Sequence, residues 1–152
     1  MRGLTIWQPY ASAIAFGDKR VENRTQPLAY RGLLAIHAGL AVEWGASDKA
    51  WIAAGLTPYK AGSERAAWTA SLALGAVVAV AEMTGCHRDG NCYLHGHPSG
   101  ICSPWAVHFQ WHYQLAEVRP LAEPVPCKGA RGLWTLPEEV ESAVRAQLGG
   151  DP

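Results

Sequence analysis

A chain of 152 residues, with 49% hydrophobic and 17% charged residues, is predicted to fold as one globular domain that buries a substantial core. Its 13 basic and 13 acidic residues give no net charge, which argues against a protein that coats long nucleic-acid duplexes but leaves room for a small basic cleft. We recognise no signal peptide and no apolar run long enough to span a bilayer, so we expect a cytoplasmic protein that makes no membrane contact. The oligomeric state is left open.

The N-terminal half is expected to mix short strands and helices. Pro9 fits the start of a helix and Gly17 its end, because proline is favoured in the first helical turn and glycine just after the last. Apolar and β-branched runs predict the strands. The expected strands are 4–8, 20–25, 32–38 and 75–83, and the expected helices are 9–16, 42–54 and 63–73.

The C-terminal half begins with a polar, glycine-rich stretch at 84–104, which we expect to be a loop insertion that covers the site as a lid. Between Trp105 and Leu115 apolar residues alternate with others, which is typical of a half-buried strand, at least from Phe109 onward. A short strand at 133–136 and a helix at 137–148 follow. With few βαβ repeats, this order predicts an α+β fold on a mixed or antiparallel sheet that curves toward a small β-barrel, with flanking helices.

Basic residues gather around a single carboxylate just after the first helix: Lys19, Arg20, Arg24 and Arg31 surround Glu22. The planar guanidinium of Arg24 can donate two parallel hydrogen bonds to a phosphate group, and the Lys19 ammonium offers a compact positive charge. Glu22 can accept a hydrogen bond from the amino group of a base or act as a general base. A solvated strand edge with a surface salt bridge is the alternative interpretation.

Residues near this basic stretch extend the candidate site. Trp7 or Tyr10 can stack on a base, and the backbone that follows Gln8 and Pro9 can offer N–H groups to an anion. Gln8 at the end of an apolar strand needs a polar partner, and a position in the core is the alternative interpretation for Trp7. The remaining candidates for ligand binding are Tyr30, Arg31, His37 and Lys128, although Arg31 could only brace a turn and His37 could be structural.

The loop region also contains thiols and imidazoles: Cys86, His87, Cys92, His95, His97 and Cys102. Zinc takes such ligands, but the spacing is not that of two CxxC knuckles. We therefore expect no bound metal and no cofactor, with a zinc site as the open alternative.

The pattern Gly17-x-Lys19-x-x-Glu22-x-Arg24 follows "WQPYASAIAFG" and precedes "YRGLLAIHAG". Together with "CSPWA" and "PVPCKGARGLW", it resembles the ASCH domain family, a branch of the PUA-like β-barrels, over roughly residues 3–136. The resemblance implies a single ASCH domain spanning residues 1–152, a PUA-like curved sheet or barrel, and a cleft beside the first helix that contains the three charged residues of the pattern.

The resemblance also implies a function linked to RNA, so the first hypothesis is a domain that binds single-stranded RNA, a nucleotide or a modified nucleoside. Some members are amidohydrolases that deacetylate N4-acetylcytidine with a Lys, a Thr and a later Glu. Lys19 matches that Lys, whereas Glu22 replaces the Thr, and Glu82 is a loose match to the later Glu. The second hypothesis is therefore a hydrolase acting on a modified nucleoside or on RNA, with Lys19, Glu22 and Arg24 as catalytic residues. A protein-interaction module is the third.

Overall fold

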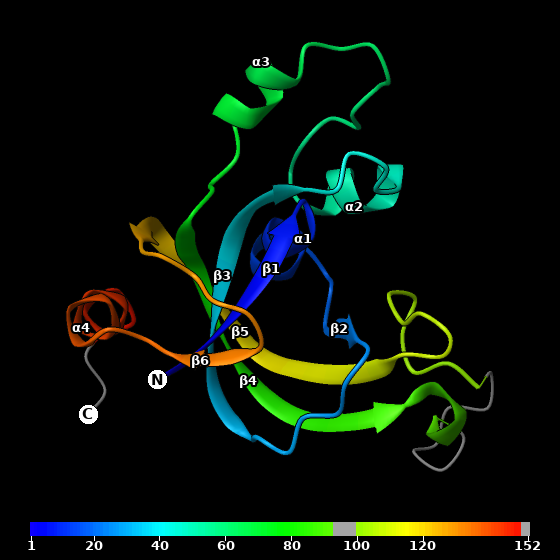
Figure 1. The fold of residues 1–152 in the computed structure, drawn as a ribbon, viewed down its shortest axis with the longest axis vertical. Helices are drawn as coiled ribbons and strands as arrows, with labels where there is room; N and C mark the ends of the chain where they lie inside the picture. Colours follow the sequence, from blue (N-terminus) through cyan, green and yellow to red (C-terminus); the bar gives the residue numbers. More distant parts are fainter. Residues whose placement is uncertain (93–99, 150–152) are drawn as a thin grey trace.

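A computed structural model describes residues 1–92 and 100–149 and has the α+β fold expected from the sequence (Figure 1). Within these described ranges, six strands form one curved sheet in the order β2-β5-β4-β3-β1-β6. The strands are β1 (Arg2–Gln8), β2 (Val21–Arg24), β3 (Gly32–Val42), β4 (Ala76–Arg88), β5 (Trp111–Pro126) and β6 (Leu133–Thr135).

The sheet is mixed and open. β1 runs parallel to β3, and all the other neighbouring pairs are antiparallel. β2 and β6 are its two edges and do not pair with each other, so the expected small barrel is not closed in the described part of the chain. The long antiparallel pair of β4 and β5 extends beyond the rest of the sheet, and its far end lies close to β2 (Figure 1).

The helices cover both faces of the sheet. Along β3, Leu34 and Ile36 pack in one cluster with Ile14 of α1, whereas Ala35 packs in another with Val144 of α4. Because successive side chains of a strand point to opposite faces, α1 and α4 lie on opposite sides. The helical segments are α1 (Tyr10–Phe16), α2 (Asp48–Ala53), α3 (Arg65–Ala70), the 3-10 turn η1 (Asp89–Asn91) and α4 (Glu138–Gln147). No helix in the described ranges is long and apolar enough to cross a membrane.

Several boundaries differ from the sequence predictions. The strand expected to end at 83 continues to Arg88, because its polar end still pairs with β5 up to the partner Trp111. The loop expected from 84 therefore begins after Arg88. The strand expected from Trp105 begins only at Trp111, because the N–H groups of Val107 and Phe109 donate to side chains and the ladders with β2 and β4 start at Trp111.

Candidate functional site

Lys19, Glu22 and Arg24 form one linked ion-pair group where α1 leads into β2. The Lys19 Nζ donates to Oε2 of Glu22 at 2.9 Å and also to the Val21 carbonyl, and the Arg24 Nε donates to Oε1 of Glu22 at 3.0 Å. Lys19 is only 2% exposed and Glu22 only 8%. A single buried carboxylate thus holds two cations, and the group carries one net positive charge.

Gly17 makes this placement of Lys19 possible. A Cβ atom on Gly17 would lie 2.4 Å from the Ala53 carbonyl oxygen and 2.8 Å from that of Ala13, so only glycine fits where α1 ends against α2. The N–H groups of Gly17 and Lys19 both donate to the Ala13 carbonyl. This tight turn directs the Lys19 side chain into the protein.

A pocket of about 350 Å³ lies beside the Lys19–Glu22 pair, and we call it the Lys19 pocket. Three separate parts of the chain supply its walls. They are the α1–β2 region with Tyr10, Lys19, Glu22 and Asn23, the start of α2 with Ser47 and Lys49, and residues 104–107 before β5.

Asn23 fixes the wall made by residues 104–107. Its Nδ2 donates to the Trp105 carbonyl at 2.8 Å, and its Oδ1 accepts from the Val107 N–H at 2.9 Å. The Trp105 indole N–H donates to Asp18 at 3.1 Å, and the Lys49 Nζ lies 4.2 Å from the Trp105 ring centroid. Asn23, Lys49 and Trp105 were not predicted as site residues, because only the folded chain brings them to Lys19.

A second hollow of about 560 Å³ adjoins the Lys19 pocket at Glu22. It shares Tyr10, Glu22 and Asn23 with the Lys19 pocket and adds Trp7 and Arg24. Trp7 is 55% exposed, so its ring is not part of the core and is open to a ligand. Lys19 and Arg24 therefore serve adjoining hollows that meet at Glu22.

Tyr10 lines both hollows and keeps its proton at neutral pH. Burial, together with the negative charges of Glu43 and Glu22, raises the pKa of the Tyr10 hydroxyl above its usual value of 10.0. The phenol can thus donate a hydrogen bond to a ligand while its ring face packs near the Lys19 ammonium, 5.7 Å from the ring centroid.

Gln8 and Pro9 support α1 from within the protein. The buried Gln8 accepts from the Ser12 N–H at 3.1 Å and donates to the Ala73 carbonyl at 2.9 Å. The polar partner expected for Gln8 is thus found within the chain, and its amide anchors the helix. Pro9 is buried and immediately precedes the first residue of α1, instead of being the first helical residue as expected.

Tyr30 and Arg31 do not reach either hollow. The Tyr30 hydroxyl donates to the Leu33 carbonyl at 2.7 Å. Arg31 donates to the carbonyls of Leu28 and Tyr30, so it braces the turn before β3, which was the alternative interpretation. Glu82, the loose match to a catalytic Glu, is exposed on β4 and also lines neither hollow.

His37 and Lys128 line a different, more apolar pocket of about 650 Å³. The His37 Nε2 lies 3.1 Å from the Cys127 carbonyl, to which it donates. Burial lowers the pKa of His37 below its usual 6.5, and the hydrogen bond to Cys127 opposes that effect. The structure thus separates these two residues from the group around Lys19.

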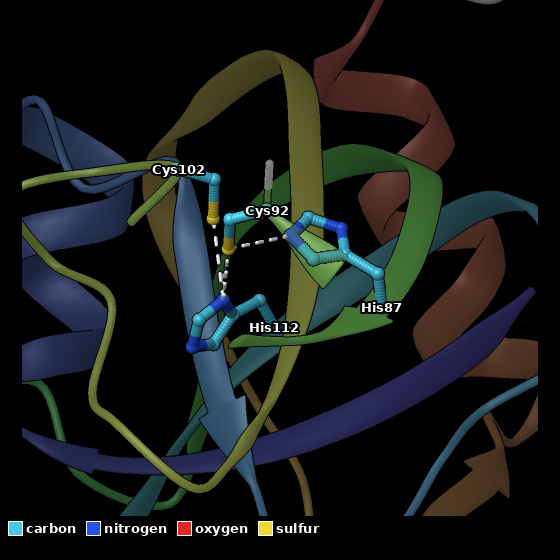
Figure 2. Close-up of side chains that lie close together, drawn as sticks. All are labelled: His87, Cys92, Cys102 and His112. Atoms are coloured by element: carbon cyan, nitrogen blue, oxygen red, sulfur yellow. Dashed lines mark hydrogen bonds between the residues drawn. The ribbon is translucent and has the colours of Figure 1, made fainter. Parts of the chain in front are cut away.

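Figure 2 shows a further group, in which His87, Cys92, Cys102 and His112 point toward one another. Their donor atoms all lie within 4.8 Å of one another. Burial and the neighbouring Cys92 raise the pKa of the Cys102 thiol to about 12. Cys86 lies apart and accepts from the Leu28 N–H, and His95 and His97 fall outside the described residues, as do residues 93–99 of the expected lid as a whole.

Solved structures of ASCH from Zymomonas mobilis resemble this chain over nearly its whole length. The unmodified protein has a TM-score of 0.53 at 13% sequence identity, covering 95% of this chain and 93% of that one. A Tyr→Phe variant of that protein has a TM-score of 0.53 at 13% identity, covering 95% of this chain and 96% of that one. A Ser→Ala variant has a TM-score of 0.51 at 13% identity, covering 95% of this chain and 94% of that one. No protein-family model and no curated protein matches the sequence. The resemblance seen in the sequence is thus confirmed as a shared ASCH fold.

Proposed function

We propose that this ASCH-fold domain binds single-stranded RNA or a nucleotide in the Lys19 pocket. The observation that carries the proposal is a pocket of about 350 Å³ that joins a buried Lys19–Glu22 pair to the exposed Lys49. Pockets for small ligands usually measure about 300–1,000 Å³ and contain a few fixed polar groups among apolar ones.

The charges and rings of the site suit a nucleotide. Lys19 and Lys49 favour a phosphate group, while Glu22 can accept a hydrogen bond from a base amino group. In the adjoining hollow, Trp7 provides an exposed ring on which a base can stack, next to Arg24. Two hollows that meet at Glu22 suit neighbouring nucleotides of a single strand.

Binding is favoured over hydrolysis by the way Lys19 is held. Its Nζ is buried and donates to the Glu22 carboxylate and to the Val21 carbonyl, so it is held as an ion-pair partner inside the protein. Ser47 brings a hydroxyl to the pocket, so a hydrolase acting on an acylated nucleoside remains the second candidate.

Titration of a short single-stranded RNA against the wild type, Lys49→Ala and Arg24→Ala tests the proposal. We expect each variant to lose about 1–2 kcal/mol of binding free energy, because each removes one charged contact. The slope of log affinity against log salt should also fall by about 0.7 for each lost phosphate contact.

Arg119→Ala is the matched control, because Arg119 is exposed on β5 and lines neither hollow. Its affinity should equal that of the wild type. Unchanged affinity in both Lys49→Ala and Arg24→Ala, or an equal loss in the control, would rule out this site. Release of acetate from N4-acetylcytidine by the wild type would instead favour the hydrolase.

A further inference from the structure

We propose that His87, Cys92, Cys102 and His112 form a structural zinc site at the end of the β4–β5 pair (Figure 2). This inference is independent of the proposed function, and it opposes our expectation of no metal. That expectation was based on the linear spacing of the residues, which does not show which side chains the fold brings together.

The distances between donor atoms fit tetrahedral zinc. The Cys92 Sγ lies 3.3 Å from the His87 Nε2 and 3.6 Å from the His112 Nδ1, and the Cys102 Sγ lies 3.2 Å from the same Nδ1. Tetrahedral coordination, with bonds of about 2.1 Å to nitrogen and 2.3 Å to sulfur, requires S···N separations of about 3.6 Å. These three S···N separations lie within about 0.4 Å of that value, and all four donor atoms lie within 4.8 Å of one another, so a zinc ion can be bound after local adjustment of the side chains.

The backbone already holds the ligands together. His87 of β4 and His112 of β5 are paired across the sheet, with ring centroids 5.4 Å apart. Cys92 follows the turn η1, where its N–H donates to the Asp89 carbonyl at 2.9 Å, and Cys102 approaches from the returning chain. Two ligands, His87 and His112, thus come from the paired strands β4 and β5. The other two, Cys92 and Cys102, come from the connection between these strands.

His112 is oriented as a metal ligand. Its Nε2 lies 2.9 Å from the Val107 carbonyl oxygen. A carbonyl can only accept, so Nε2 carries the proton and the lone pair of Nδ1 faces the two sulfur atoms. The single lone pair of the His112 Nδ1 cannot accept good hydrogen bonds from both the Cys92 and the Cys102 thiol. A metal cation, in contrast, can coordinate both sulfur atoms and one nitrogen of each imidazole.

The burial and charge of the group indicate a structural role. His87, Cys92 and His112 are buried, and four protein ligands leave no open position for a substrate. Binding of Zn²⁺ would release the Cys92 and Cys102 thiol protons to solvent, and the two thiolates would then balance the charge of the ion.

The site would also hold one wall of the Lys19 pocket. That wall is made by residues 104–107, which follow the ligand Cys102 in the chain. At its other end, the Val107 carbonyl accepts a hydrogen bond from the ligand His112. Loss of zinc should therefore loosen this wall while the distant strands β1 and β3 stay protected.

Metal analysis of the full chain, purified without added metal, tests the proposal. We expect one equivalent of zinc in the wild type and its loss in Cys92→Ser and Cys102→Ser. Cys127→Ser is the matched control, because Cys127 lies outside the group and should keep the metal. If the ligand variants fail to fold, Co²⁺ added to chelator-treated wild type should give the visible bands of tetrahedral cobalt and a thiolate charge-transfer band.

Hydrogen exchange supplies a second readout. Chelation should increase exchange at the amides of residues 105–107 and leave β1 unchanged. The proposal is overturned if wild type binds neither Zn²⁺ nor Co²⁺, if Cys92 and Cys102 form a disulfide in the purified protein, or if zinc content is the same in Cys92→Ser.

Discussion

At the residue scale, Glu22 is the group on which the site depends. Replacing it with Gln leaves the buried Lys19 ammonium without a charged partner, and breaking a buried pair in this way costs about 3 kcal/mol. Urea denaturation should show this loss in Glu22→Gln. Glu82→Gln is the control, because the exposed Glu82 should change stability by less than about 0.5 kcal/mol.

The double variant Lys19→Met with Glu22→Gln refines this prediction. This double variant removes both the Lys19 and the Glu22 charge, so no unpaired charge of that ion pair stays buried. It should therefore recover part of the stability lost in Glu22→Gln. If Glu22→Gln is as stable as Glu82→Gln, the carboxylate does not hold Lys19 in place and our description of the site is wrong.

His37 gives a pH dependence at the same scale. Because burial lowers its pKa in the folded protein, the unfolded chain takes up the proton first as the pH falls. The contribution of His37 to stability is therefore complete above its unfolded pKa of about 6.5 and declines below it. Urea midpoints measured between about pH 7.5 and pH 5.5 should fall less steeply in His37→Gln than in wild type; parallel curves would contradict this assignment.

At the element scale, α4 is the helix that the sequence predicted best, because the stripe of Val140, Val144 and Leu148 marks its buried face. Val144 is fully buried against the sheet face opposite α1. Val144→Ala should therefore cost about 2 kcal/mol in unfolding free energy. The exposed Ser142 provides the control Ser142→Ala, and an equal loss in both variants would show that α4 is not docked as described.

The start of β5 shows where local patterns fail. Residues from Trp105 alternate as in a strand, yet their backbone groups bond to side chains instead. The Val107 N–H donates to Asn23, and the Phe109 N–H donates to Asp89 at 2.8 Å. Such side-chain bonds compete with a strand ladder, and their partners are far away in the sequence, so no local pattern reveals them.

At the scale of the whole molecule, the sequence predicted the fold class and the charged group of Lys19, Glu22 and Arg24, whose members are close in the chain. It did not predict the open sheet or the wall made with Asn23 and Trp105, because these depend on long-range pairing. The assembly of His87 with His112 likewise follows from strand register, which linear spacing does not contain.

The central claim is that the Lys19 pocket receives the nucleotide. Amide and indole chemical shifts of isotope-labelled protein, followed during titration with a short single-stranded RNA, test this most directly. We predict that the largest shifts occur at Tyr10, Asn23 and Trp105, which line that pocket. Shifts confined to the separate pocket of His37 and Lys128, or no shifts at saturating RNA, would contradict the claim.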